Sequence, residues 1–480
     1  MQSNGAIRGP DTRHDKELEE GVGQTPNSGT LVQNGATAQS ENVKAPAGGL
    51  DGKGVEAVNG AGGVLAKVLS RTQSRTSYID PGPPPDGGRR AWTQAFMAHL
   101  MVFNTWGYIN SFGVFQTYYV TALNHPPSAI SWVGSVQIFL LFFIGTFSGR
   151  ATDYGLFRPT FFLGSFFQVL GVFMTSLSTK YWQLFLAQGI CTGIGNGLVF
   201  CPCLAVVSTY FSKRRSFAIG IGASGTATGG LVFPVIVQQL LPKIGFAWTV
   251  RIQAFVMLTV SLITLAFFKT RLPPRKSGPI VEWSAFKELS YDLFTIGMFL
   301  IFWALYFAFY YVGSFGRNIL HISESSSIND LLIINGVGLF GRLIPNYLAD
   351  RFFGPLNVII PFAFISGLLL YCWAAVTSPG GLIGFAVTYG IFAAGIQGLF
   401  PSVVASLTTD LKKTGVRMGM VFSAISFAVL TGPPLGGALI QNENGKYLDA
   451  QMWAGSALML GFLMLIASRV VAKGWGWARI

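Results

Sequence analysis

From Trp92 onward the chain alternates between long apolar runs and short polar connections. Each run has about 20 residues, which is the length that crosses a bilayer as a helix. The runs are centred near Asn104, Leu140, Gln168, Asn196, Gly225, Leu258, Trp303, Val337, Ser366, Ala394, Ala428 and Leu460. A basic, proline-containing loop over about 269–291 divides them six and six. We therefore predict an all-α membrane protein with twelve transmembrane helices in two six-helix halves, 89–268 and 292–472, and a short end at 473–480.

The first 88 residues have a different character. They contain no Phe or Trp and a single Tyr, and they are rich in Gly, Ser, Asn, Ala and Pro. Such a segment buries too little apolar surface to offset the entropy of folding. We expect residues 1–88 to form a disordered tail on the cytoplasmic side.

Composition and charge agree with a membrane protein and indicate its orientation. Hydrophobic residues make up 51% of the chain and charged residues 11%. Residues 1–92 hold ten basic and ten acidic side chains, so the net charge of +13 lies entirely in the membrane part. This distribution does not suggest a nucleic-acid partner. With the tail inside, the only basic residues in external loops are Lys180, Lys243, Arg251, Arg317 and Lys446. The positive-inside rule then places both termini in the cytosol, in the plasma membrane or the vacuolar membrane.

The sequence gives little indication of catalytic or metal chemistry. The four cysteines fall within apolar runs, without a nearby His or carboxylate to complete a metal site. The one His inside a run, His99, has no acid close to it in the sequence. We expect no enzyme activity, no cofactor and no metal, and we interpret the glycine clusters within the runs as helix-packing surfaces.

An internal repeat relates the two halves. Five residues of the first half recur at the same offsets, 199 residues later, in the second. Pro202, Lys213, Arg214, Gly220 and Pro234 correspond to Pro401, Lys412, Lys413, Gly419 and Pro433. Parallel halves with a site between them at the midplane are typical of alternating-access transporters.

Arg342 is the most unusual residue of the apolar runs. It stands eight residues before Asp350, about 12 Å along a helix, which places it inside the hydrocarbon zone. Asp330 is twelve residues back, about 18 Å away and too far for an ion pair. A guanidinium without a carboxylate partner suits a carboxylate, phosphate or enolate of a ligand. The alternative is that Arg342 extends to the cytosolic interface and braces the loop.

Other polar and aromatic residues within the runs are further candidates. The amides are Asn104, Asn110, Gln116, Gln137, Asn196, Asn335 and Gln397. Each could line a cavity or only join two helices by hydrogen bonds. Trp303, Tyr306, Phe307 and Tyr310 share a helical face by three- and four-residue spacing. That row could stack a planar aromatic substrate, or it could face lipid or a neighbouring helix.

Local motifs resemble those of the major facilitator superfamily. Its loop signature, Gly-x-x-x-Asp-Arg-x-Gly-Arg, is approximated at Gly149 to Asp153, with Arg158 beyond, and again around Asp350 and Arg351. Within the superfamily, 86–472 is similar to the monocarboxylate transporter family, particularly its fungal members. The motifs that carry this similarity are Asp86-Gly87-Gly88 and Tyr210-Phe211-Ser212-Lys213-Arg214-Arg215.

The resemblance implies roles for individual residues. The substrate-facing arginine of the family falls on Arg342, and the helices that commonly line the cavity contribute Asn110, Asn335 and Gln397. We add Tyr306 and Tyr310 as substrate-binding residues. The loop residues, by the same resemblance, would form a conformational switch: Gly149, Asp153, Arg158, Asp350 and Arg351.

Two departures from the family pattern bear on the substrate. Gly338 stands where proton-coupled monocarboxylate carriers have an Asp, and Asn110 stands at the position of a Lys. We therefore expect a carrier of a larger, planar or acidic solute, with export of a secondary metabolite as one possibility and proton coupling left open. Uptake of a monocarboxylate or of a vitamin such as riboflavin is the alternative, and a non-transporting nutrient sensor is another. The expected partners are the small-molecule substrate and the lipid bilayer, without an obligate protein partner.

Overall fold

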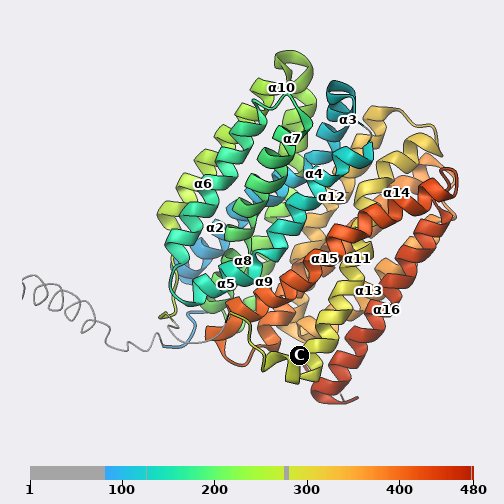
Figure 1. Ribbon diagram of the computed structural model, residues 1–480. Coiled ribbons are helices and arrows are strands. Elements are labelled where there is room, and N and C mark those ends of the chain that lie inside the picture. The colour runs from blue at the N-terminus through green and yellow to red at the C-terminus, as the bar shows by residue number, and fades with distance from the viewer. Residues whose placement is uncertain (1–81, 126, 275–279, 477) are drawn as a thin grey trace, which may run out of the picture. The chain divides into compact units, whose positions relative to one another are not determined.

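The computed structural model describes residues 82–125, 127–274, 280–476 and 478–480. Every regular element in those ranges is a helix (Figure 1). The expected disordered tail falls largely on residues 1–81, outside the described residues.

The first half, as we name it, consists of the helices up to Phe267. They are α2 (Gly88–Asn110), α3 (Phe112–Leu123), α4 (Pro127–Phe143), α5 (Gly145–Asp153), α6 (Phe157–Thr175), α7 (Tyr181–Leu184), the π-helix η1 (Phe185–Cys191), α8 (Thr192–Tyr210), α9 (Arg215–Ala223) and α10 (Gly225–Phe267). Several pairs follow one another directly, such as α2 with α3 and α4 with α5, so that each pair forms one bent spanning unit.

The second half follows the central segment, which contains the 3-10 turn η2 (Ala285–Lys287). Its helices are α11 (Leu289–Asn318), α12 (Glu324–Leu348), the π-helix η3 (Ala349–Phe353), α13 (Pro355–Trp373), α14 (Pro379–Leu407), the 3-10 turn η4 (Leu411–Lys413), α15 (Thr414–Asn442) and α16 (Leu448–Lys473).

The described helices supply twelve membrane crossings. Ten stretches are long and apolar enough to span a bilayer, and one of them, Arg215–Phe267, has 53 residues. That length is about 80 Å of helix, more than twice the hydrocarbon thickness. Gly245, at φ 74°, breaks it into two crossings, because glycine tolerates this backbone conformation. Helices α2 and α3 form the remaining crossing, so the twelve-helix all-α fold predicted from the sequence is confirmed.

The repeated glycines lie where the two halves cross. A Cβ on Gly220 of α9 would lie 2.8 Å from the carbonyl oxygen of Arg342 in α12. A Cβ on its repeat mate, Gly419 of α15, would lie 2.6 Å from the Cα of Thr146 in α5. Only a residue without a side chain fits either crossing. The internal repeat therefore marks two equivalent contacts between the halves.

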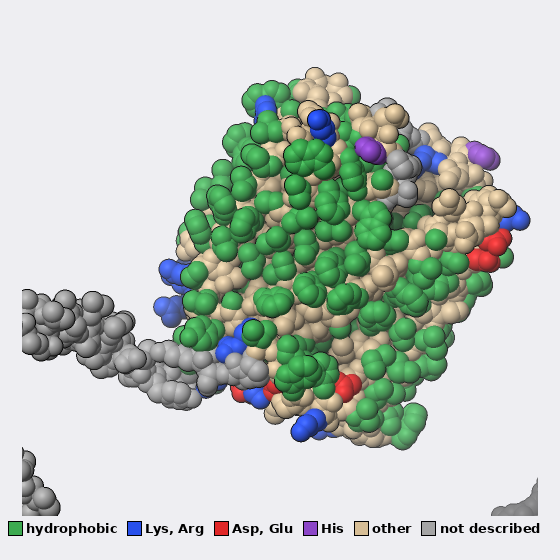
Figure 2. Space-filling model, viewed as in Figure 1, with side chains coloured by type: hydrophobic (Ala, Val, Ile, Leu, Met, Phe, Trp, Pro, Cys, Tyr) green, Lys and Arg blue, Asp and Glu red, His purple; other side chains and the backbone are tan. Residues whose placement is uncertain are grey.

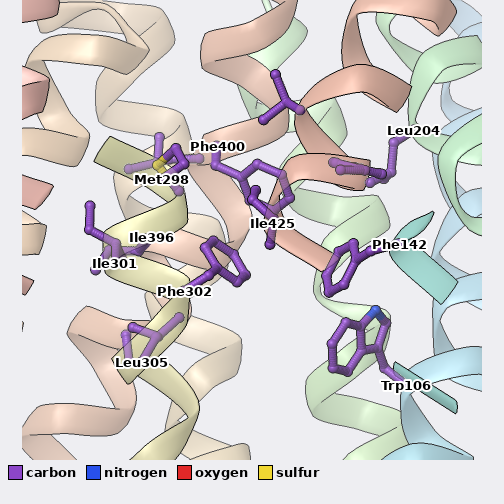
Figure 3. Packing of buried hydrophobic residues seen from close by; sticks show 14 of the residues in the cluster. Trp106, Phe142, Leu204, Met298, Ile301, Phe302, Leu305, Ile396, Phe400 and Ile425 are labelled. Carbon is purple, nitrogen blue, oxygen red and sulfur yellow. The ribbon is translucent and has the colours of Figure 1, made fainter. Parts of the chain in front are cut away.

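An aromatic layer fills the space between the halves (Figure 3). Phe142 of α4 lies 6.1 Å from Phe302 of α11 and 5.6 Å from Phe422 of α15, measured between ring centroids. Phe302 in turn lies 5.0 Å from Phe400 of α14. All four rings are buried. We call these four residues the aromatic floor, because a cavity lies directly beyond them.

Apolar side chains also cover the outside of the bundle (Figure 2). Phe162, Leu262 and Phe340 are large hydrophobic residues of three different spanning helices, and each is exposed in the described structure. Such a surface would be unfavourable in water and is suited to lipid. The pattern of apolar runs thus reflects two demands, helix packing inside and lipid contact outside.

Candidate substrate site

A cavity of about 760 Å³ lies between the two halves. It extends from Arg342 and from Trp106, which packs on Phe142 of the aromatic floor, to Arg317 and Gln441, which are exposed at the opposite end of the helices. We call that exposed end the cavity end, and the end that carries Asp153 and Asp350 the latch end. All six residues predicted to bind substrate line this one cavity: Asn110, Tyr306, Tyr310, Asn335, Arg342 and Gln397. They come from α2, α11, α12 and α14, so the fold brings together residues from both halves.

Arg342 is held at the inner end of the cavity with only 2% of its surface exposed. One terminal nitrogen, Nη1, donates to the carbonyl oxygen of Gly338 at 3.2 Å, and Nη2 donates to Oε1 of Gln397 at 2.6 Å. Within the described ranges, no carboxylate oxygen lies within 4.0 Å of the guanidinium. A guanidinium has five N–H donors, so several remain for a ligand. This position does not match the alternative in which Arg342 extends to the cytosolic interface, because the side chain is buried and lines the cavity.

Gly338 makes room for this arrangement. A Cβ at position 338 would lie 2.6 Å from Nη1 of Arg342, closer than two such atoms approach. The guanidinium therefore occupies the space that a side chain at 338 would need. A glycine at position 338, rather than a residue with a side chain, is thus what allows the arginine to lie here.

Gln397 completes the polar end of the cavity. Its Oε1 accepts a hydrogen bond from Arg342. The other atom of the amide group, Nε2, is therefore a donor that is not used in this contact. That nitrogen is buried and has no hydrogen-bond partner among the described residues. Arg342 and Gln397 together present unused N–H groups from two different helices, which is a donor set that suits an anion.

Asn110 and Asn335 form a neutral link between the halves. Nδ2 of Asn110 donates to Oδ1 of Asn335 at 3.2 Å, and Nδ2 of Asn335 donates to the carbonyl oxygen of Leu331 at 3.0 Å. A Cβ on Gly230 of α10 would lie 2.7 Å from Nδ2 of Asn110, so the glycine lets this pair pack closely. Asn110 and Asn335 thus join α2 and α12 through an uncharged amide pair.

Aromatic rings form one wall of the cavity. Trp106 of α2 stacks on Tyr306 of α11, with ring centroids 5.8 Å apart and an interplanar angle of 13°. Phe309, Tyr310 and Tyr311 continue the lining along α11. A planar substrate could extend this stack by offset ring contacts.

The predicted aromatic row on α11 divides into two parts. Tyr306 and Tyr310 line the cavity, whereas the Trp303 ring lies 5.4 Å from that of Trp453 in α16. Phe307 packs on Trp373 of α13 at 5.4 Å. Residues three apart on a helix differ by about 60° in direction, so one edge of the row faces the cavity and the other faces neighbouring helices.

Two aspartates at the latch end bind the first turns of helices in the opposite half. Asp350 accepts from the backbone N–H groups of Ser216 and Phe217, at 3.0 and 2.7 Å, at the start of α9. Asp153 accepts from the N–H of Val416, at 3.0 Å, at the start of α15. Carboxylates are favoured there by the free N–H groups and by the helix dipole. We call these two contacts the latches.

The other predicted switch residues take different places. Gly149 lies at the crossing of α5 and α15, where a Cβ would lie 2.8 Å from the carbonyl carbon of Gly415. Arg158 is exposed at the start of α6. Arg351 donates to the hydroxyl of Tyr347, 3.1 Å away, within its own half. The structure thus brings Gly149, Asp153 and Asp350 to the interface between the halves, and it leaves Arg158 and Arg351 away from it.

An ionic cluster at the latch end did not emerge from the sequence. The buried Arg417 of α15 contacts Glu282 at 3.4 Å and Glu288 at 2.5 Å, and Lys413 contacts Glu282 at 2.5 Å. Burial raises the pKa of Glu282, but hydrogen bonds from Lys413 and Ser284 and the charge of Arg417 lower that pKa overall. Arg417 could have been noticed as a second arginine inside an apolar run, and Glu282 as an acid within a basic loop.

Arg317 is a further cavity residue that sequence reasoning did not select. It lines the cavity near its exposed end, and its Nη1 donates to the hydroxyl of Ser327 at 2.7 Å. Its position in the sequence could have drawn attention to it, because it is one of the few basic residues in the predicted external loops. The cavity therefore has an arginine near each end.

Comparison with known proteins agrees with this architecture. An "MFS-type transporter" of Gibberella zeae is 48% identical over 84% of this chain and 92% of its own length. An "Aspyridones efflux protein" of Emericella nidulans is 36% identical over 81% of this chain and 80% of its own length. An "Agnestins efflux protein" of Paecilomyces divaricatus is 36% identical over 84% of this chain and 93% of its own length.

Solved structures share the fold at low identity. The human organic anion transporter MFSD10 matches with a TM-score of 0.65 and 16% identity, over 80% of this chain and 100% of that chain. The FucP transporter in its outward conformation matches with a TM-score of 0.61 and 14% identity, over 79% and 99%. The model of the Major Facilitator Superfamily covers residues 95–409. With its paired halves, its cavity between them and these relatives, the chain belongs to the Major Facilitator Superfamily of membrane transporters.

Proposed function

We propose that this transporter exports a small acidic organic metabolite by alternating access. The observation that carries the proposal is Arg342, buried at the inner end of the cavity with neutral partners. A cation at that depth is costly unless a ligand or a counter-ion balances it. Two relatives that are 36% identical are named as efflux proteins, which supports export over uptake.

The substrate class follows from the chemistry of the lining. Arg342 and Gln397 offer N–H donors to an acidic group, and Trp106 and Tyr306 offer ring faces beside them. A planar molecule with a carboxylate or an acidic enol fits both features. The cavity volume of about 760 Å³ lies within the range of small-molecule pockets and far exceeds the size of lactate.

For transport, the cavity must close at the end where it is now open and open at the other end. In the described structure the latch end is closed by the aromatic floor and by Asp153 and Asp350, while the lining reaches the exposed Arg317. Opening of the latch end, with closure around Arg317, would give the alternate state. If both termini are cytosolic, as the charge distribution predicts, the described state faces outward.

Transport by the purified protein in liposomes tests this proposal. Labelled planar aromatic carboxylates should be transported, and Arg342→Ala should lower the rate at least about tenfold, since the loss of one charge-assisted pair is worth roughly 1.5–3 kcal/mol. Arg342→Lys, which retains the charge but not the bidentate geometry, should recover part of the rate. The variants must insert and fold as the parent protein does.

Four results would contradict the proposal. Proton-driven accumulation of labelled lactate would favour the monocarboxylate alternative, and riboflavin uptake would favour a vitamin carrier. Normal flux in Arg342→Ala would remove the arginine from the substrate site. A protein that binds its ligand but moves none across the membrane would be a sensor.

A further inference from the structure

The segment Ile280–Leu289, which leads into α11 and ends at its first residue, docks on α15 through one of its faces. Glu282 is buried and accepts from Nζ of Lys413 at 2.5 Å and from Nε of Arg417 at 3.4 Å. Ala285 is fully buried within the main hydrophobic cluster. A buried acid between two bases fixes this face of the segment in one orientation, because removal of either partner would leave an uncompensated charge.

A second ionic contact reinforces the first. Both terminal nitrogens of Arg417 donate to the carboxylate of Glu288, at 2.9 and 2.5 Å, in bidentate geometry. The same guanidinium lies over the ring of Tyr291, 5.6 Å from its centroid. Arg417 is the neighbour of Val416, whose N–H binds Asp153 in one of the two latches. The segment is therefore joined to the start of α15, where the latch is formed.

The opposite face of the segment is apolar and exposed. Ile280, Trp283, Phe286 and Leu289 recur every three residues, and all are exposed. Trp283 has 71% of its surface exposed, and its ring lies 5.8 Å from that of Phe286. Residues three apart share one side of a 3-10 turn, which the chain adopts at 285–287. Together these four residues form a strip that we call the apolar strip.

The apolar strip is continuous with the lipid-facing surface of a spanning helix. Ile296 of α11 is exposed seven residues after Leu289, and such spacing places both on the same helical face. Figure 1 shows the chain entering α11 at the end of the bundle where α15 begins, and Figure 2 shows hydrophobic side chains beside charged ones at this end of the molecule. Trp is enriched at the depth of lipid headgroups, where a spanning helix begins.

We propose that Ile280–Leu289 is a membrane-surface anchor, with the apolar strip inserted among the lipid headgroups of the leaflet at the latch end. The partner is the bilayer itself, reached by continuity with α11. Through Glu282, Glu288 and Arg417, the anchor holds the start of α15 in the position that the closed latch requires. This inference depends on membrane insertion of the helices and is independent of the substrate.

Spin labelling in liposomes tests the anchor. A spin label is attached at position 283 in Trp283→Cys and, as the control, at position 287 in Lys287→Cys. Both variants are made in a Cys191→Ser, Cys372→Ser background. Each labelled protein is then exposed to oxygen, which partitions into lipid, and to a water-soluble nickel chelate. Oxygen should accelerate the spin relaxation of the label at 283 more than the nickel chelate does. The label at 287 should show the opposite preference. Equal access of nickel to both sites would overturn the proposal, and so would protection of site 283 from both reagents, which would indicate a protein cover.

The coupling of the anchor to the latch has its own readout. Cys201 is buried at the interface of the halves, with Sγ 3.9 Å from the carbonyl oxygen of Gly415 in the first turn of α15. In the Cys191→Ser, Cys372→Ser background, the double change Trp283→Ser, Phe286→Ser should raise the rate at which a membrane-permeant maleimide labels Cys201 severalfold. Lys287→Ser serves as the control and should leave that rate unchanged. A wild-type rate in the double variant would overturn the coupling.

Discussion

At the scale of single residues, Gly338 and Arg342 determine each other's place. The guanidinium lies where a side chain at 338 would lie, and the carbonyl oxygen of Gly338 accepts one of its N–H bonds. An aspartate at 338 would come within ion-pair distance of Arg342 and neutralise it. Arg342 would then no longer present its charge to a ligand.

We predict that Gly338→Asp lowers the transport of an acidic substrate at least about tenfold, or roughly 1.4 kcal/mol in the barrier. The variant should also raise the melting temperature, because a buried cation gains a counter-ion. Gly338→Asn has nearly the same shape without the charge and should retain more of the rate. Equal rates in the two variants would show that volume, and not charge, matters at this position.

The sequence alone was sufficient to predict that Arg342 lies within the membrane and has no carboxylate close by along its helix. It could not predict the bond to Gln397, which lies 55 residues away on α14. Such contacts depend on how helices rotate against one another, and the apolar pattern of a buried helix leaves that rotation open. Because the rotation of α11 could not be predicted, the row from Trp303 to Tyr310 was expected to act as one surface. In the structure, part of the row lines the cavity and part packs against neighbouring helices.

At the scale of elements, the latches connect helix ends of opposite halves. Asp350 accepts charge-assisted hydrogen bonds from two N–H groups of α9, and Asp153 accepts from the N–H of Val416 in α15. Each bond of this kind is worth about 1.5–3 kcal/mol, while two access states differ by only a few kcal/mol. Weakening of one latch is therefore sufficient to shift the population.

Asp350→Asn should open the latch end more often. The amide keeps one acceptor oxygen, but its NH2 group faces a backbone N–H and cannot accept from it. In the Cys191→Ser, Cys372→Ser background, we expect a membrane-permeant maleimide to label the buried Cys201 about tenfold faster or more in this variant. Asp449→Asn is the matched control, because Asp449 begins α16 at the cavity end. Unchanged labelling in Asp350→Asn would mean that the aromatic floor alone keeps this end closed.

At the scale of the whole molecule, the repeat of 199 residues predicted two matched halves, and the crossings at Gly220 and Gly419 explain why those glycines recur. The apolar runs predicted the crossings but not their bends, such as the break at Gly245, because a run of suitable length fits a straight or a bent helix equally. The access state was also beyond sequence reasoning, since it depends on a small energy difference between two packed arrangements. The resemblance to monocarboxylate carriers is a prediction that the superfamily match leaves open.

The orientation in the membrane is a prediction about the whole chain. Predicted cytoplasmic segments carry 28 of the 33 basic residues, which favours a cytosolic latch end and a cavity end that faces out. The two ends of α16 offer a matched pair of probes, since Glu443 and Lys473 are both exposed and flank the same helix. In the Cys191→Ser, Cys372→Ser background, a membrane-impermeant maleimide applied to intact cells should label Glu443→Cys and leave Lys473→Cys unlabelled until the cells are permeabilised. The reverse pattern would invert the topology, and the described state would then be open toward the cytosol, ready to load the metabolite that we propose it exports.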